Sequence, residues 1–180
     1  MASSTGVRTV TVTEYLSDPA YEHQEYAQGQ VVERNVGGKS HSRIQARCAR
    51  KLAEYLDRRS DAYVATELHC RLQVGGDVRF RLPDVAVVLG DANPKENRYL
   101  EGAPALAIEI RSPEDSITQL VRKIDEYLAN GSEMAWLILP EEKGLMLFTP
   151  GAPVRTLLEH DTLGGAILPG FQIRVNELFA

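Results

Sequence analysis

Two short apolar runs constrain the fold more than any other feature of the sequence. They are LPDVAVV (82–88) and ALAIEIRS (105–112), and each contains one acid within the run, Asp84 in the first and Glu109 in the second. Aspartate and glutamate are almost never fully buried unless they are paired or bound to metal, because an unpartnered buried carboxylate is strongly destabilising. Both runs therefore predict sheltered strands in which each acid has a partner.

The alternation of side chains along a strand gives each acid room on its own face. Successive strand residues point to opposite faces, so Asp84 shares a face with Ala86. Glu109 likewise shares a face with Ala107. Neighbouring strands lie about 4.8 Å apart, and Mg²⁺ is commonly held by one or two carboxylates. A shared divalent cation is one interpretation; the alternatives are that Asp84 caps its strand and that Glu109 pairs with Arg111.

Two amphipathic helices are indicated by apolar residues at a 3.6-residue period. The first begins at Ser42, a good N-cap residue, and the second follows RSPEDS and ends at the dipeptide NG. In the second helix Lys123 falls at the edge of the apolar stripe, whereas Arg122 and Glu126 face outward. A lysine at that boundary can direct its amine toward the acids of a sheet; the alternative is an ordinary surface lysine.

The remaining pattern predicts strands and turns. A short helix in TVTEYL ends before Pro19, and EYAQGQVVER reads as a hairpin that turns at Gly29. Two long strands joined by a glycine turn are expected in YVATELHCRLQV and VRFRLPDVAVVLG, with Pro83 punctuating the second. Further strands are MAWLILP, GLMLFTP, VRTLLE and one in LPGFQIRVNELF. Helices between buried strands predict an α/β (α+β) fold with a central mixed sheet flanked by helices.

Composition and length set the wider expectations. The 180 residues, 43% of them hydrophobic, predict one domain over 1–180 with a flexible segment at 1–8. No apolar run reaches the roughly 20 residues of a membrane span, and no secretory signal is evident. We therefore expect a cytoplasmic protein without a membrane partner.

Charge is distributed unevenly. The net charge of −5 argues against coating nucleic acid by bulk electrostatics, but it permits a local basic groove. The first helix carries an excess of arginines, among them Arg43 and Arg47, which are candidates for contacts with a phosphate backbone. A solvated helix face is the alternative interpretation of this segment.

The cysteines and one further acid carry weaker signals. Cys48 and Cys70 lack the close spacing of zinc ligands, so buried thiols are favoured over a zinc site that includes His69 or His41. Glu67 lies in an apolar strand setting, and a surface acid on an edge strand is the favoured interpretation.

The motifs together resemble the Uma-type family of restriction endonucleases, within the PD-(D/E)XK nuclease superfamily. The resemblance rests on LPDVAVV, LAIEIRSPEDS and KIDEYLANGSEMAWLI, and it extends in order to TVTEYL, EYAQGQVVE, His41 and LPGFQIRVNELF. It implies a restriction-endonuclease-like core. It also implies a metal held by Asp84 and Glu109, and a lysine near the attacking water.

The chain departs from the superfamily pattern at one position. The ExK lysine is replaced by Arg111, and the resemblance places the lysine on the following helix, at Lys123. Glu25 corresponds to an early acid of the family that can hold the metal directly or through water. Arg111 is left to contact a phosphate oxygen, in the fork geometry that suits arginine.

The function implied is a Mg²⁺-dependent endonuclease that acts on DNA, with Mn²⁺ as a substitute. A homodimer is expected, because cutting two strands favours two sites related by a dyad. One alternative is a catalytically inactive, nuclease-like module for nucleic-acid binding or assembly. Another is a metal site that serves a small phosphorylated substrate. The sequence does not predict the DNA sequence recognised, the cut position, the strand preference or the biological role.

Overall fold

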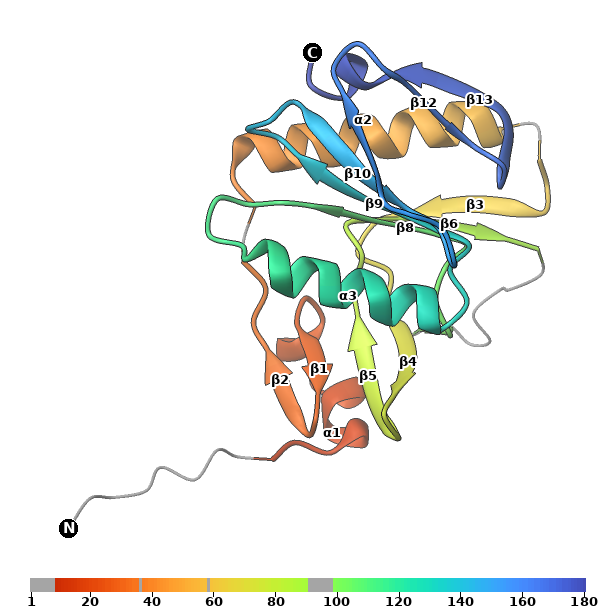
Figure 1. The fold of residues 1–180 in the computed structure, drawn as a ribbon. Helices are drawn as coiled ribbons and strands as arrows, with labels where there is room; N and C mark the ends of the chain where they lie inside the picture. The colour runs from red at the N-terminus through yellow and green to blue at the C-terminus, as the bar shows by residue number, and fades with distance from the viewer. Residues whose placement is uncertain (1–8, 36, 58, 91–98) are drawn as a thin grey trace.

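The computed structural model describes residues 9–35, 37–57, 59–90 and 99–180 (Figure 1). The segment predicted to be flexible, residues 1–8, lies outside these ranges, as do residues 91–98 of the loop after the first acidic run. Within the described ranges, no helix is long and apolar enough to cross a membrane.

A six-stranded mixed sheet forms the centre of the fold. Its strand order is β11-β10-β9-β8-β6-β3, and only β8 and β9 are parallel neighbours. The prediction of a central mixed sheet is confirmed. The strands are β3 (Ala62–Ala65), β6 (Val85–Leu89), β8 (Leu106–Ile110), β9 (Met134–Leu139), β10 (Gly144–Phe148) and β11 (Arg155–Leu158).

The two predicted helices cover opposite faces of this sheet (Figure 1). Helix α2 (Lys39–Leu56) packs on the face that carries Val85 and Ile108, whereas α3 (Ile117–Ala129) packs on the face of Ala107. Fully buried side chains on both faces exclude water from the centre of the molecule, and this burial is the main source of stability. The alternation predicted for the two acidic runs is thereby confirmed, since the small residues lie on the α3 face.

The start of α2 differs from the prediction. The N-cap is Gly38 rather than Ser42, and the helix therefore begins one turn earlier. The reason is that the carbonyl oxygen of Gly38 already accepts the hydrogen bond from the backbone N–H of Ser42, at 3.1 Å. The end of α3 agrees with the prediction: Asn130 is the C-cap, and Gly131 follows with φ +112°.

A second, five-stranded sheet was not anticipated. It has the order β2-β1-β5-β4-β7 and lies beneath α3 in the lower part of Figure 1. Its core contains Tyr15, Tyr26 and Phe80, with α1 (Val12–Ser17) and the 3₁₀ helix η1 (Pro19–Tyr21) packed nearby. The strands are β1 (Glu25–Ala27), β2 (Gln30–Val32), β4 (Cys70–Val74), β5 (Asp77–Arg81) and β7 (Leu100–Glu101).

Both long strands predicted on either side of the glycine turn are in fact divided between the two sheets. The first breaks between β3 and β4, where Glu67 has a φ of +53°. The second breaks between β5 and β6 at Pro83, whose carbonyl oxygen accepts the N–H of Glu67 at 3.2 Å. Proline has no N–H for a strand ladder, and a positive φ interrupts one, so neither strand can continue. Asp84 comes directly after this crossing.

The C-terminal segment completes the core on the α2 side. Strands β12 (Thr162–Gly165) and β13 (Leu168–Arg174) form a two-stranded ribbon, followed by the 3₁₀ helix η3 (Val175–Leu178). Phe171 stacks against Trp136 of β9, with ring centroids 6.3 Å apart. The predicted final strand and helical turn are confirmed.

Candidate active site

The two acids that interrupt the apolar runs face each other. Strands β6 and β8 are antiparallel with Val85 opposite Ile108, so extending the register by one pair places Asp84 opposite Glu109. Directly opposed residues project to the same face with Cβ atoms about 4.5–5.5 Å apart. Both side chains line a cavity of about 390 Å³, and each residue is only 3% exposed.

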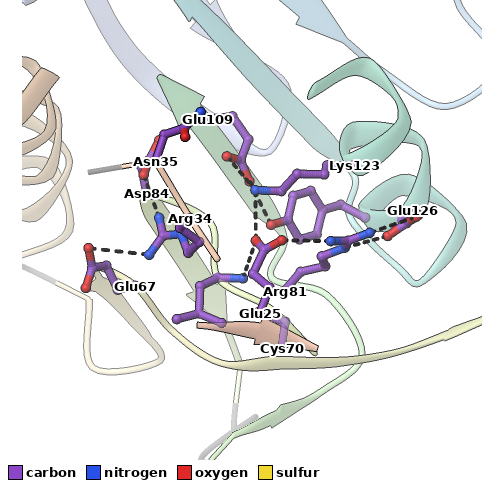
Figure 2. Close-up of polar contacts among 12 residues, drawn as sticks. Glu25, Arg34, Asn35, Glu67, Cys70, Arg81, Asp84, Glu109, Lys123 and Glu126 are labelled. Atoms are coloured by element: carbon purple, nitrogen blue, oxygen red, sulfur yellow. Dashed lines mark hydrogen bonds and ion pairs between the residues drawn. The ribbon is translucent and has the colours of Figure 1, made fainter. Parts of the chain in front are cut away.

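Lys123 reaches this cavity from α3 and bridges two carboxylates (Figure 2). Its Nζ lies 2.8 Å from Oε1 of Glu25 and 3.0 Å from the carboxylate oxygens of Glu109. One turn further along α3, the hydroxyl of Tyr127 donates to Oε1 of Glu109 at 2.8 Å. The surface-lysine alternative is wrong, because the Lys123 side chain is only 15% exposed.

Burial and charge set the protonation of this group. Burial raises the pKa of Glu109 to about 7, although Lys123 opposes the rise. Burial also acts to raise the pKa of Glu25, but Lys123 and Arg81 outweigh it and hold this pKa at about 2. For Lys123, burial is outweighed by Glu109 and Glu25, which raise its pKa above the ordinary value. At neutral pH, Lys123 is therefore a charged hydrogen-bond donor and not a free base.

Asp84 is held by a different set of partners. Its Oδ1 accepts from Nη2 of Arg34 at 2.9 Å, and Nε2 of His41 lies 3.2 Å from Oδ2. The backbone N–H of Ile110 donates to Oδ2 at 2.7 Å; this bond joins Asp84 to the end of β8 and does not cap the start of its own strand β6. Burial lowers the pKa of His41, but the bond to Asp84 outweighs burial and raises it overall. Arg34 also pairs with Glu67, as Figure 2 shows.

Glu126 was predicted to face outward, and this prediction is wrong. The residue is only 9% exposed. Its Oε2 accepts from Nε of Arg81 at 2.7 Å, and its Oε1 accepts from Nη2 of Arg81 at 3.2 Å. Arg79 also donates to Glu126. The reason is that strand β5 presents two arginines toward α3, which draw an acid inward from the helix.

Three predicted phosphate-contacting arginines do not line the cavity. Nη1 of Arg111 lies 3.3 Å from Glu142, on the turn between β9 and β10. Glu109 therefore pairs with Lys123 and not with Arg111, so that alternative is wrong. Arg43 is exposed and Arg47 is half-buried on α2. The residues of α2 that approach the acids are His41 and, through the backbone carbonyl of Asp84, Gln45.

The weaker sequence signals are resolved by burial. Cys48 and Cys70 are buried free thiols, in keeping with the favoured interpretation. Among the described residues, no group of three or more histidine, cysteine or acidic side chains is arranged to hold a metal. Glu67 is partly exposed, with its side chain 40% accessible, and it pairs with His23 at 3.3 Å.

The donor chemistry of the cavity fits a hard divalent cation. Asp84 and Glu109 supply carboxylate oxygens from facing positions, which is the usual protein contribution to a Mg²⁺ site. The raised pKa of Glu109 shows that its ionised form lacks sufficient compensation in this cavity. Glu25 also lines the cavity, where Lys123 contacts one of its oxygens and Arg81 the other; its role as a ligand stays a prediction.

Arg34, Gln45 and Arg81 are site residues that sequence reasoning missed. A signal existed for Arg81: VRFR places charged residues on one face of a strand and apolar residues on the other. A second signal was the spacing of Glu126 three residues after Lys123, which puts both on one side of α3. Nothing in the sequence indicated Arg34 as the partner of Asp84, because the two lie far apart along the chain.

Comparison with known proteins agrees with this fold. No curated protein matches the chain. One solved structure that does match is described as a "putative nuclease belonging to DUF820 from Anabaena variabilis"; it is 25% identical, has a TM-score of 0.80, and the match covers 94% of this chain and 97% of that one. Residues 12–176 match the Uma2 family, described as "Putative restriction endonuclease". With the mixed sheet, the opposed acids and the bridging lysine in place, the chain belongs to the Uma2 family of restriction-endonuclease-like proteins.

Proposed function

We propose that this protein is a Mg²⁺-dependent endonuclease that hydrolyses phosphodiester bonds of DNA, with Mn²⁺ able to replace Mg²⁺. One observation carries the proposal: the charged amine of Lys123 lies against Glu109 in a cavity where Asp84 is directly opposite. The family description and the similar solved structure, both of which refer to nucleases, support the same activity.

The acids and the lysine of the cavity would have different roles in the reaction. Asp84 and Glu109 would hold the ion, which when bound polarises the scissile phosphate and lowers the pKa of a water molecule. Lys123 remains protonated and donates a hydrogen bond to the attacking water or to a phosphate oxygen. A fixed positive charge at that position stabilises the negative charge that develops in the transition state.

The substrate would approach across a partly basic surface. Arg122 of α3 is exposed and lines the cavity beside Lys123. Arg43 and Arg47 lie outside the cavity on α2, where they would contact the DNA backbone at a distance from the cut. We assign no substrate contact to Arg111, because it does not line the cavity and its Nη1 pairs with Glu142.

Plasmid cleavage tests the proposal. Supercoiled DNA is incubated with the wild-type protein and with the Asp84→Asn and Lys123→Met variants, in Mg²⁺ and in EDTA. We expect wild-type cleavage in Mg²⁺ only, its loss in both variants, and its retention in a Glu142→Gln control. Equal cleavage in EDTA, or full activity in both variants, would refute the assignment.

A non-catalytic module is the second candidate, and one observation favours it. Asp84 pairs with Arg34 and Glu109 with Lys123 without any metal, as the acids of a structural ion-pair network would. Calorimetric titration with Mn²⁺ separates the candidates. Saturable binding that is lost on Glu109→Gln supports the enzyme, whereas no binding supports the module.

Two further proposals concern partners. We propose that DNA is the substrate and not a small phosphorylated compound, so duplex DNA should bind at moderate salt and compete with a labelled duplex. We also propose a homodimer, because cleavage of both strands favours paired sites. Light scattering should then give twice the chain mass of 19.9 kDa, and a value equal to that mass would contradict the dimer.

A further inference from the structure

Four charged side chains that line the cavity form a chain of ion pairs, which the backbone of α3 closes into a ring. Lys123 contacts Glu25, Glu25 contacts Arg81, Arg81 contacts Glu126, and Glu126 lies on α3 three residues after Lys123. The ring joins three elements, α3, β1 and β5, and its charges alternate in sign. Figure 2 shows it as a chain of dashed contacts from Lys123 to Glu126.

The contacts of the ring leave little freedom to its members. Oε1 of Glu25 lies 2.8 Å from Nζ of Lys123, while Oε2 accepts from Nη1 of Arg81 at 2.7 Å. The backbone N–H of Leu82 also donates to Glu25, at 3.3 Å. Arg81 is in turn fixed by two bonds from Glu126. Side-chain exposures within the ring are 15% or less.

Only Lys123 of this ring touches the acid that would bind the ion. In the part of the chain that the structure describes, Arg81 and Glu126 make no hydrogen bond or ion pair with Glu109 or Asp84. They act on Glu25, and Glu25 acts on Lys123. Without Arg81, the carboxylate of Glu25 would keep only Lys123 and the long bond from Leu82, so the second anchor of the lysine would be held less firmly.

We propose that Arg81 and Glu126 are positioning residues, which hold Glu25 so that the amine of Lys123 stays aimed at Glu109 and the reacting phosphate. This inference rests on the proposed nuclease function for its kinetic consequence. Its structural consequence is that the Lys123 amine is immobilised, and this effect does not depend on enzymatic activity. Arg81 and Glu126 thus support the lysine and contribute no group of their own to the reacting atoms.

The kinetic test uses the nearly isosteric Glu126→Gln variant of the full chain. A misplacement of about 1 Å can lower a rate on the order of 10²-fold, so we expect kcat to fall at least about tenfold. The KM for DNA should rise by no more than about twofold, because Glu126 lines the cavity with an acid, which offers no favourable contact to a phosphate. Glu177→Gln is the matched control, since the Lys51–Glu177 pair joins α2 to η3 outside the cavity. An unchanged kcat in a folded Glu126→Gln variant overturns the proposal.

A double-variant comparison tests whether Glu126 acts through Glu25. In a Glu25→Gln background, adding Glu126→Gln should lower kcat by no more than about twofold, because the link is already broken. Independent, multiplicative losses would contradict the ring. If Glu126→Gln does not fold, the Arg81→Gln/Glu126→Gln protein removes both charges of this buried pair together, so that Arg81 is not left facing an uncharged partner. The same fall in kcat is expected of it.

A metal-free measurement distinguishes failure of this inference from failure of the proposed function. The rate of reductive methylation of Lys123 is followed by mass spectrometry in EDTA. We expect modification to be about threefold faster or more in Glu126→Gln, because the amine opens more often to solvent, and unchanged in Glu177→Gln. A wild-type protein without nuclease activity would refute the function, whereas an unchanged methylation rate in Glu126→Gln would refute the ring.

Discussion

Replacing Glu109 by glutamine should make the folded protein more stable at alkaline pH. Burial raises the pKa of Glu109 from its ordinary value of 4.5 to about 7. Folding raises this pKa, so the folded state favours the protonated acid. The stability that Glu109 contributes is therefore complete at a pH below the pKa of the unfolded chain, and it is lost as the pH rises through about 7. Each pKa unit corresponds to about 1.36 kcal/mol, so ionised Glu109 destabilises the fold by on the order of 3 kcal/mol.

The Glu109→Gln variant resembles the protonated acid at every pH. Urea unfolding of both proteins in EDTA, between about pH 4.5 and pH 8, should show a free-energy difference that grows with pH and favours the variant. Glu142→Gln, on an exposed turn, should show no such trend. The reasoning is refuted if the difference between Glu109→Gln and wild type does not change with pH, or if it changes in the opposite direction. Added Mn²⁺ should stabilise only the wild type.

Three further substitutions test the surroundings of the site and the fold. Tyr127→Phe removes the hydroxyl donor to Glu109, so calorimetry should show Mn²⁺ affinity reduced by about 10–100-fold, as for other supports of metal ligands. Leu52→Ala, at a fully buried position of α2, should lower the free energy of unfolding in urea by about 2–5 kcal/mol. Gly29→Ala should lower it by about 1–2 kcal/mol, because Gly29 has φ +75° and an added Cβ would meet Thr9 at 2.8 Å.

Periodicity was sufficient to predict the centre of the site. The two-residue repeat of a strand placed Glu109 on the face of Ala107, and the 3.6-residue repeat placed Lys123 at the edge of the buried stripe. Both placements are confirmed by the cores on either side of β8 and by the contact between the two residues. The positions of Glu109 and Lys123 depend only on the local geometry of a strand and a helix, which the spacing of apolar residues in the sequence indicates.

The second sheet and the ring could not be predicted in the same way. The pattern of apolar residues does not change where the chain passes from one sheet to the other, between β3 and β4 and between β5 and β6. Only Pro83 and the positive φ of Glu67 distinguish these two positions. Arg81 and Glu126 lie 45 residues apart, and sequence spacing does not reveal which helix face meets which strand. The predicted roles of Asp84 and Glu109 in metal binding stay predictions, since the structure bears on their placement and not on their ligand.

The division of the charged residues between two sheets has a consequence for synthesis and folding. Glu25 belongs to the small sheet, Glu109 to the large one and Lys123 to the helix above the small sheet. Contacts between residues so distant along the chain form late, because loop closure must precede them. No early segment of a growing chain holds the complete set of charges, so the nascent protein can complete the cavity only after α3 has docked.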